Sequence, residues 1–248
     1  MLENVLLVGA AFALGGILKG ATGAGAPLLA IPILALLYDV PTAITLFAVP
    51  NLVPNVWQSW RFRSTRLPTS FLWQFAVAGG VGAVIGTYAL ANVDSTYLLL
   101  VVAFAVLGYI GFRLMRPDWV LPYATARRVV IPLGVIAGTL QGSGGISAPV
   151  SLTYLNAMKL ERGQFISAIS LFFTGIAVVQ IPLLIGYGFM TPDLFWLSCG
   201  ALAVVLAFMP VGTYLVRHVS KSAFDRIILV LLSLLSFKMI SQVVLAHM

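Results

Sequence analysis

Two glycine- and proline-rich stretches hold the residues most able to do chemistry in this sequence. GILKGATGAGAP at 16–27 and GTLQGSGGISAP at 138–149 align without a gap at an offset of 122 residues. Glycine permits backbone turns that other residues resist, and proline favours the first turn of a helix. Each stretch therefore predicts a helix break, with a new helix starting at Pro27 or Pro149. Backbone N–H groups at a helix start bind anions, so the chemistry expected here is anion binding.

Lys19 is the most unusual of these residues, because it lies inside the apolar segment 4–38. A lysine near the centre of a bilayer costs roughly 2.5–3.5 kcal/mol. All seven Asp and Glu residues fall in or beside predicted loops, so no acidic partner is evident. Lys19 is then either the counter-charge of an anionic substrate or a side chain that snorkels to the membrane interface. Lys238 lies nearer a helix end, which favours snorkelling there.

Polar residues on two later helices extend the candidate site. Asn51, Asn55 and Gln58 recur on one face of a helix at 41–60, and Gln180 matches Gln58 at the same offset of 122. We expect Gln58 and Gln180 to face the cavity, with interhelical hydrogen bonding as the competing role. No catalytic or metal-binding residue is expected. The candidate substrate-binding residues are Lys19, Gly20, Thr22, Gly23, Gly25, Asn51, Gln58, Gln141, Gly142, Ser143, Gly144, Gly145, Ser147 and Gln180.

Composition sets the class of protein that must position these residues. Sixty per cent of the residues are hydrophobic, 8% are charged and the mean hydropathy is +1.05, whereas soluble domains carry about 25% charged residues. The chain is therefore predicted to be an integral membrane protein. The single cysteine excludes an internal disulfide. We expect no cofactor, no nucleic-acid binding and no enzyme activity, since no acid pair or serine–base pair is apparent and His218 and His247 lie at predicted helix ends.

The hydropathy pattern predicts the helices that cross the membrane, each of which needs about 20 apolar residues. Besides six uninterrupted spans, the chain has two apolar segments, 4–38 and 129–158, that the glycine motifs divide into fragments of roughly 11 to 16 residues. These fragments favour pairs of half-length helices that enter and return on one side, with two tilted full helices as the alternative. The six predicted spans are 41–60, 70–91, 96–115, 163–186, 193–216 and 224–246.

The basic residues predict the orientation of these spans. Loops near 61–69, 113–128, 159–162 and 217–226 hold twelve of the fourteen Lys and Arg residues, and the opposite loops hold none. Because cytoplasmic loops are enriched in Lys and Arg, both termini are predicted to be periplasmic in a bacterial inner membrane. The N-terminus lacks a basic n-region and is expected to be retained as a membrane segment.

The repeated motif predicts an all-α polytopic protein built from two inverted-topology repeats. Residues 1–120 and 121–248 would each hold one broken, re-entrant hairpin and three transmembrane helices, within one integral membrane domain. GTY at 86–88 and 212–214 also matches, at an offset of 126. Three crossings invert the second half, an arrangement common in secondary transporters with a midplane site. Small-residue spacing such as Gly82-x-x-x-Gly86 instead predicts close helix packing.

With both motifs in view, the chain resembles the sulfite exporter family TauE/SafE. The resemblance rests on GGILKGATGAGAP and AGTLQGSGGISAP, each followed by a helix, with a basic loop ending the first unit. It implies an inner-membrane carrier that exports sulfite or a small organosulfonate such as sulfoacetate. Ala24 and Ala26 make the first motif less glycine-dense than in many members, which leaves the size and identity of the anion open. The matching residues are Gly20, Gly23, Gly25, Pro27, Gly142, Gly144, Gly145 and Pro149.

The sequence also bears on energetics and on alternative functions. Without an intramembrane carboxylate there is no proton relay, and an inside-negative potential drives anions outward. We therefore expect a uniporter-like exporter with alternating access, whose partners are a small anion and the lipid bilayer. A homo-oligomer is left open. The alternatives are an uptake permease for another small organic or inorganic anion, with or without a coupling ion, a channel and an intramembrane enzyme.

Overall fold

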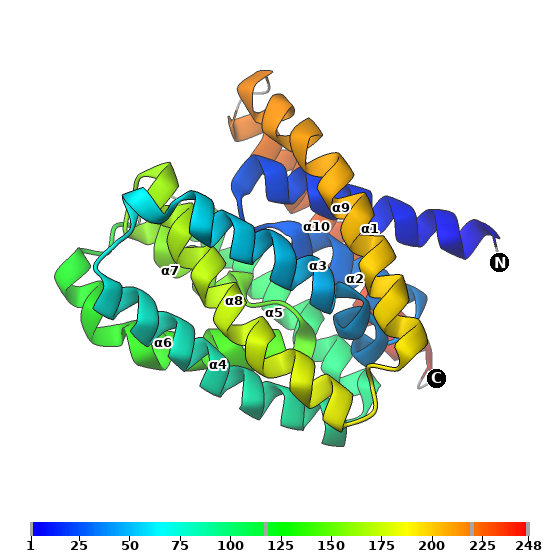
Figure 1. The fold of residues 1–248 in the computed structure, drawn as a ribbon. Helices are drawn as coiled ribbons and strands as arrows, with labels where there is room; N and C mark the ends of the chain where they lie inside the picture. Colours follow the sequence, from blue (N-terminus) through cyan, green and yellow to red (C-terminus); the bar gives the residue numbers. More distant parts are fainter. Residues whose placement is uncertain (1, 117–118, 219–220, 247–248) are drawn as a thin grey trace.

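The computed structural model describes residues 2–116, 119–218 and 221–246, and in these ranges the regular secondary structure is helical, without strands (Figure 1). The all-α, polytopic prediction is confirmed. His247 lies outside the described residues, whereas His218 ends a helix as expected. The elements are α1 (Leu2–Thr22), α2 (Ala26–Leu37), α3 (Val40–Arg61), the 3-10 turn η1 (Arg63–Thr65), α4 (Thr69–Asn92), α5 (Ser95–Met115), α6 (Tyr123–Gly144), α7 (Ala148–Ala157), α8 (Arg162–Gly186), α9 (Pro192–His218) and α10 (Lys221–Ala246).

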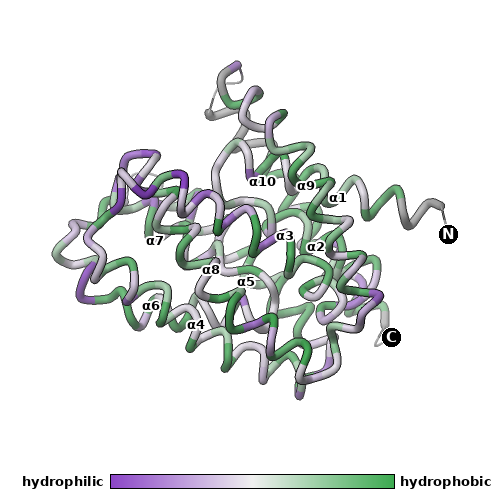
Figure 2. The backbone as a smooth tube through the Cα atoms, viewed as in Figure 1, coloured by the Kyte–Doolittle hydropathy of each residue, from purple (hydrophilic) through white to green (hydrophobic). Residues whose placement is uncertain are grey.

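Five of the described helices are long and apolar enough to cross a membrane: α4, α5, α8, 192–216 of α9 and 228–245 of α10. The sixth predicted span, 41–60, is present as α3 but is not among the five. Three prolines and the polar residues Asn51, Asn55 and Gln58 lower its hydropathy. It packs against both α8 and α9 (Figure 1). The remaining helices carry hydrophobic residues over most of their length, and hydrophilic segments gather near the ends of helices (Figure 2).

The two helix breaks lie where the glycine motifs predict them, at Gly23–Gly25 and Gly145–Ser147. Gly23 (φ 84°) and Gly145 (φ 71°) adopt the left-handed conformation that ends a helix. The second arms, α2 and α7, are short at 12 and 10 residues. The first arms, α1 and α6, have 21 and 22 residues, so the prediction of half-length fragments is wrong for them.

Close packing explains why α1 and α6 continue through their glycines. α1 lies against α9 and α6 lies against α4. A Cβ at Gly20 would overlap the Met209 carbonyl, and one at Gly142 would lie 2.7 Å from the Ala83 carbonyl oxygen. The expected turn at these two glycines is therefore absent, because tertiary contact overrides the weak helix propensity of glycine. The same contacts confirm that Gly82 and Gly86 are packing residues, since both face the α6 backbone.

These contacts recur between the two halves of the chain. Gly212 on α9 faces the Ile17 carbonyl on α1, and Gly86 on α4 faces the Thr139 carbonyl on α6. Ile17 and Thr139 are separated by the motif offset of 122 residues, and Gly86 and Gly212 by the GTY offset of 126. The first half therefore supplies α1 to the contact with α9, and α4 to the contact with α6. In each contact, the first helix of one half packs against the fourth helix of the other half.

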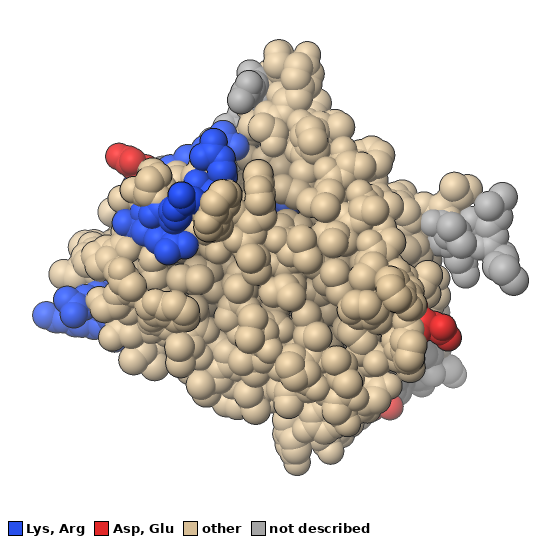
Figure 3. Space-filling view, viewed as in Figure 1, with Lys and Arg blue, Asp and Glu red and all other residues tan. Residues whose placement is uncertain are grey.

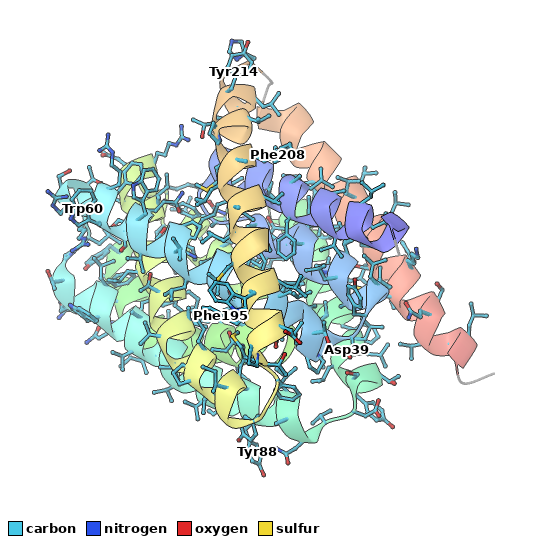
Figure 4. All side chains as sticks on the ribbon, turned by 45° about the vertical axis from the view of Figure 1, so that its right-hand side comes forward. Asp39, Trp60, Tyr88, Phe195, Phe208 and Tyr214 are labelled. Atoms are coloured by element: carbon cyan, nitrogen blue, oxygen red, sulfur yellow. The ribbon has the colours of Figure 1, made fainter. Side chains whose placement is uncertain are left out.

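Charged side chains are unevenly distributed over the molecule. Lys and Arg gather at the end where α3 ends and α6 begins, whereas acidic atoms are visible mainly at the opposite end (Figure 3). Asp39, which caps α3 by accepting from the Thr42 amide at 2.7 Å, and Trp60 mark the two ends of α3 (Figure 4). The guanidinium of Arg63 lies 4.6 Å from the centre of the exposed Trp60 ring. This pairing suits a membrane–water interface.

Candidate substrate site

At the first break, Lys19 ties the end of α1 to α3. Its Nζ donates to the Gly23 carbonyl oxygen (2.8 Å) and to Asn55 Oδ1. Asn55 Nδ2 donates in turn to the Asn51 carbonyl oxygen at 2.6 Å. The Lys19 side chain is only 2% exposed, which rules out snorkelling for this lysine. Lys238 is exposed, in keeping with its position on an outer helix face.

Thr22 binds the backbone of the break just before α2 begins. Its Oγ1 accepts hydrogen bonds from the amides of Ala24 (3.2 Å) and Gly25 (3.0 Å) and donates to the Leu18 carbonyl oxygen (2.8 Å). The amides predicted to hold an anion thus already face one oxygen atom. An oxyanion could bind them by taking the place of this hydroxyl.

At the second break, Gln141 takes the place that Lys19 has in the first. Gln141 Nε2 donates to the Gly145 carbonyl oxygen at 2.9 Å, and Gln141 Oε1 accepts from the Ser147 amide at 3.0 Å. Lys19 and Gln141 are equivalent in the motif, and so are Gly23 and Gly145, the glycines whose carbonyls they contact. Both side chains therefore hold a break closed in the same way, but only one of them can carry a charge.

Gln58 and Gln180 make hydrogen bonds between helices. Ser170 Oγ donates to Gln58 Oε1 at 3.1 Å, joining α8 to α3. Gln180 Nε2 donates to the Gly142 carbonyl oxygen at 3.3 Å, joining α8 to α6. Both side chains are 5% exposed. These contacts match the competing role that the sequence left open for the two glutamines.

The other motif residues are held inside α6. Ser143 Oγ donates to the Thr139 carbonyl oxygen at 2.9 Å, one turn earlier in the same helix. Gly144 belongs to the last turn of α6 and faces the Val102 side chain. The break itself contains Gly145 and Ser147, so the expectation that Gly144 shapes the turn is wrong. The helix runs two residues past Gly142 before it ends.

A cavity of about 660 Å³ reaches the first break. Thr22, Ala24 and Gly25 line it from the break, and the remaining wall comes from α1, α2, α5, α7, α8, α9 and α10, with the α7–α8 loop. Of the predicted site residues, only Thr22 and Gly25 are among those lining this cavity. Five polar residues of its wall were not predicted from the sequence, because basic residues in loops are already accounted for by membrane topology. They are Tyr109, Arg113, Asn156, Lys159 and Arg162.

A bundle with five membrane-length helices, two helix breaks and a cavity that reaches one of them has the architecture of a multi-pass membrane transporter. Residues 7–239 match the family model described as sulfite exporter TauE/SafE. The match covers most of the 248 residues, and the chain belongs to this family. Membership implies a membrane transporter of sulfur-containing anions. No curated protein and no solved structure matched the chain.

Proposed function

We propose that this protein exports a small anion, sulfite or a small organosulfonate such as sulfoacetate, across the bacterial inner membrane. The observation that carries the proposal is the cavity that joins the Thr22–Gly25 break to a basic wall. An anion that enters this cavity meets the amides of Ala24 and Gly25, which Thr22 Oγ1 now occupies. Helix-start amides stabilise oxyanions through their partial positive charge.

Alternating access between two inverted repeats, 1–120 and 121–248, is the transport mechanism that we infer. The equivalent contacts of α1 with α9 and of α6 with α4 support the repeat. The position of the basic end supports an orientation with that end cytoplasmic and both termini periplasmic. In Figure 1, α1 begins and α10 ends on the side away from that basic end.

The membrane potential is the driving force in this proposal. No carboxylate lies among the described residues that line the cavity or contact Lys19. A proton relay would need such a group, whereas the inside-negative potential supplies about 2.3 kcal/mol per charge per 100 mV for outward anion movement. Export then proceeds without a coupling ion and without chemical conversion of the substrate.

Sulfite efflux from proteoliposomes tests this function. Vesicles loaded with sulfite receive a potassium diffusion potential of either sign, and efflux is measured with and without proton and sodium gradients. Saturable efflux that accelerates when the interior is negative is expected. Strict dependence on a proton or sodium gradient, with no response to potential, contradicts the proposal. Flux without saturation identifies a channel, and a panel of sulfonates and carboxylates distinguishes a permease for another anion.

A further inference from the structure

Cationic side chains converge on the cavity from three separate parts of the chain. Arg113 comes from α5, Lys159 follows the end of α7, and Arg162 begins α8. Tyr109 and Asn156 add a hydroxyl and an amide to the same wall. Most of the other lining side chains are apolar, and none of the described lining residues is acidic. Fixed positive charge within low-dielectric walls concentrates anions.

The one acidic residue adjacent in sequence to this cluster does not line the cavity. Glu161 precedes Arg162 and takes part in the capping box that starts α8, in which its amide donates to Gln164 Oε1 at 3.3 Å. The carboxylate is engaged at the helix start, outside the cavity lining. The charged residues among the described lining residues are therefore all basic.

The repeat shows that this cluster exists in only one half of the protein. The offset of 122 relates α7 and the start of α8 to α2 and the start of α3, and α5 and α10 begin 126 residues apart. α10 contacts α2 as α5 contacts α7. Every counterpart is apolar, and three of them are fully buried: Leu34, Val40 and Met239. Leu34, Leu37, Val40, Leu235 and Met239 occupy the positions equivalent to Asn156, Lys159, Arg162, Tyr109 and Arg113.

We propose that Arg113, Lys159 and Arg162 form an anion-collecting site at the basic wall of the cavity, separate from the helix break and present on one side of the membrane only. Arginine binds oxyanions in a bidentate manner, and lysine acts as a point charge. The site gathers the sulfite or sulfonate group before it reaches Thr22. Because the equivalent wall is apolar, an anion approaching from the other side meets no such attraction. The proposal rests on the proposed transport function and adds that anions are collected on one side of the membrane only.

Sided membrane vesicles provide the test. The triple variant Arg113→Gln, Lys159→Gln and Arg162→Gln is compared with Arg128→Gln, which removes an exposed charge from the α6 segment without touching the cavity. For sulfite supplied from the basic side, the triple variant should raise the half-saturating concentration on the order of tenfold or more. The maximal rate from the basic side and the half-saturating concentration from the opposite side should stay unchanged. The maximal rate from the opposite side should fall by the same factor, because thermodynamics fixes the ratio of the two Vmax/KM values of an uncoupled carrier. High salt should shrink the difference from wild type, because it screens the charges.

Charge-retaining substitutions separate attraction from folding. The variant Arg113→Lys, Lys159→Arg and Arg162→Lys keeps three positive charges and should restore most of the wild-type affinity on the basic side. The site is refuted if the glutamine variant behaves as Arg128→Gln does, if it raises the half-saturating concentration equally on both sides, or if the charge-retaining variant is equally impaired. Absence of any sulfite flux in the wild-type protein would overturn the transport function itself, and the collecting site with it.

Discussion

Replacing Lys19 by glutamine separates the two roles that the structure gives this residue. In the second half, Gln141 already makes the contact that a glutamine at position 19 would need, since its Nε2 donates to the Gly145 carbonyl at 2.9 Å. Lys19→Gln should therefore keep the hydrogen bond to the Gly23 carbonyl and leave the break intact. It removes only the charge beside the start of α2.

The effect of that charge can be estimated from the geometry. Lys19 Nζ lies 2.8 Å from the Gly23 carbonyl oxygen. An anion on the Ala24 and Gly25 amides would be about 7 Å from Nζ, where an effective dielectric constant of about 20 gives an attraction of about 2 kcal/mol. That energy corresponds to roughly a 30-fold change in affinity. Lys19→Gln should raise the half-saturating sulfite concentration by this factor.

Lys19→Ala should behave differently, because it leaves the Gly23 carbonyl and Asn55 Oδ1 without their donor. Each unsatisfied buried acceptor costs about 1–3 kcal/mol. The alanine variant should unfold at a lower temperature in detergent than the glutamine variant. Lys238→Gln is the matched control, since it removes an exposed lysine from α10.

Efflux from proteoliposomes and thermal unfolding measure the two effects independently. A Lys19→Gln protein with wild-type half-saturation would refute the role of Lys19 as the substrate's counter-charge. Equal stability of the alanine and glutamine variants would refute its role in closing the break. The two results do not depend on each other, so each role can fail alone.

Two further predictions concern packing and hydrogen bonding between the halves. For both, the free energy of unfolding is measured in detergent. Gly212→Ala should prevent folding or cost about 3 kcal/mol or more, because its Cβ would overlap the Ile17 carbonyl. Gly108→Ala has open space around it and should instead stabilise by roughly 0.5–1 kcal/mol; equal effects would contradict the packing argument. Thr213→Val should cost about 1 kcal/mol, because Thr213 Oγ1 donates to a carbonyl of α1 at 3.2 Å. Thr87→Val should be neutral or stabilising, because Thr87 Oγ1 is buried without a partner. If both variants lose a comparable free energy of unfolding, the two threonines do not differ in hydrogen bonding as described.

The positions of the breaks could be predicted from sequence because they depend on local chemistry. Gly23 and Gly145 adopt backbone angles that few other residues reach, and Pro27 and Pro149 lie in the first turn of α2 and α7, a position that proline favours. The length of α1 could not be predicted in the same way. Glycine lowers helix propensity locally, yet Gly20 remains helical because it lies against α9, almost 190 residues further along the chain.

The residues of the cavity wall could not be predicted from the sequence, because they too depend on tertiary packing. Arg113, Lys159 and Arg162 come from three separate segments, and only the packing of α5 beside α7 brings them together. Their charge has a sufficient explanation in membrane topology, so the pattern offered no sign of a second role. Comparison with the repeat counterparts would not have provided one. Arg113 aligns with Met239, but in an inverted repeat the positive-inside rule already predicts that the opposite side lacks basic residues.

The two halves make similar backbone contacts but differ in their hydrogen bonds. The Gly20 carbonyl accepts from Thr213, whereas the equivalent Gly142 carbonyl accepts from Gln180 at 3.3 Å. Thr87, the counterpart of Thr213, is left without a partner. Alternating access between inverted repeats would exchange these arrangements, so that Thr87 donates to Gly142 when the cavity opens on the other side. The unpaired hydroxyl then disfavours the present state by the energy that the opposite state recovers. Thr87→Val should remove that difference and shift the equilibrium towards the conformation seen here, which accessibility of cavity residues to thiol reagents from each side would measure.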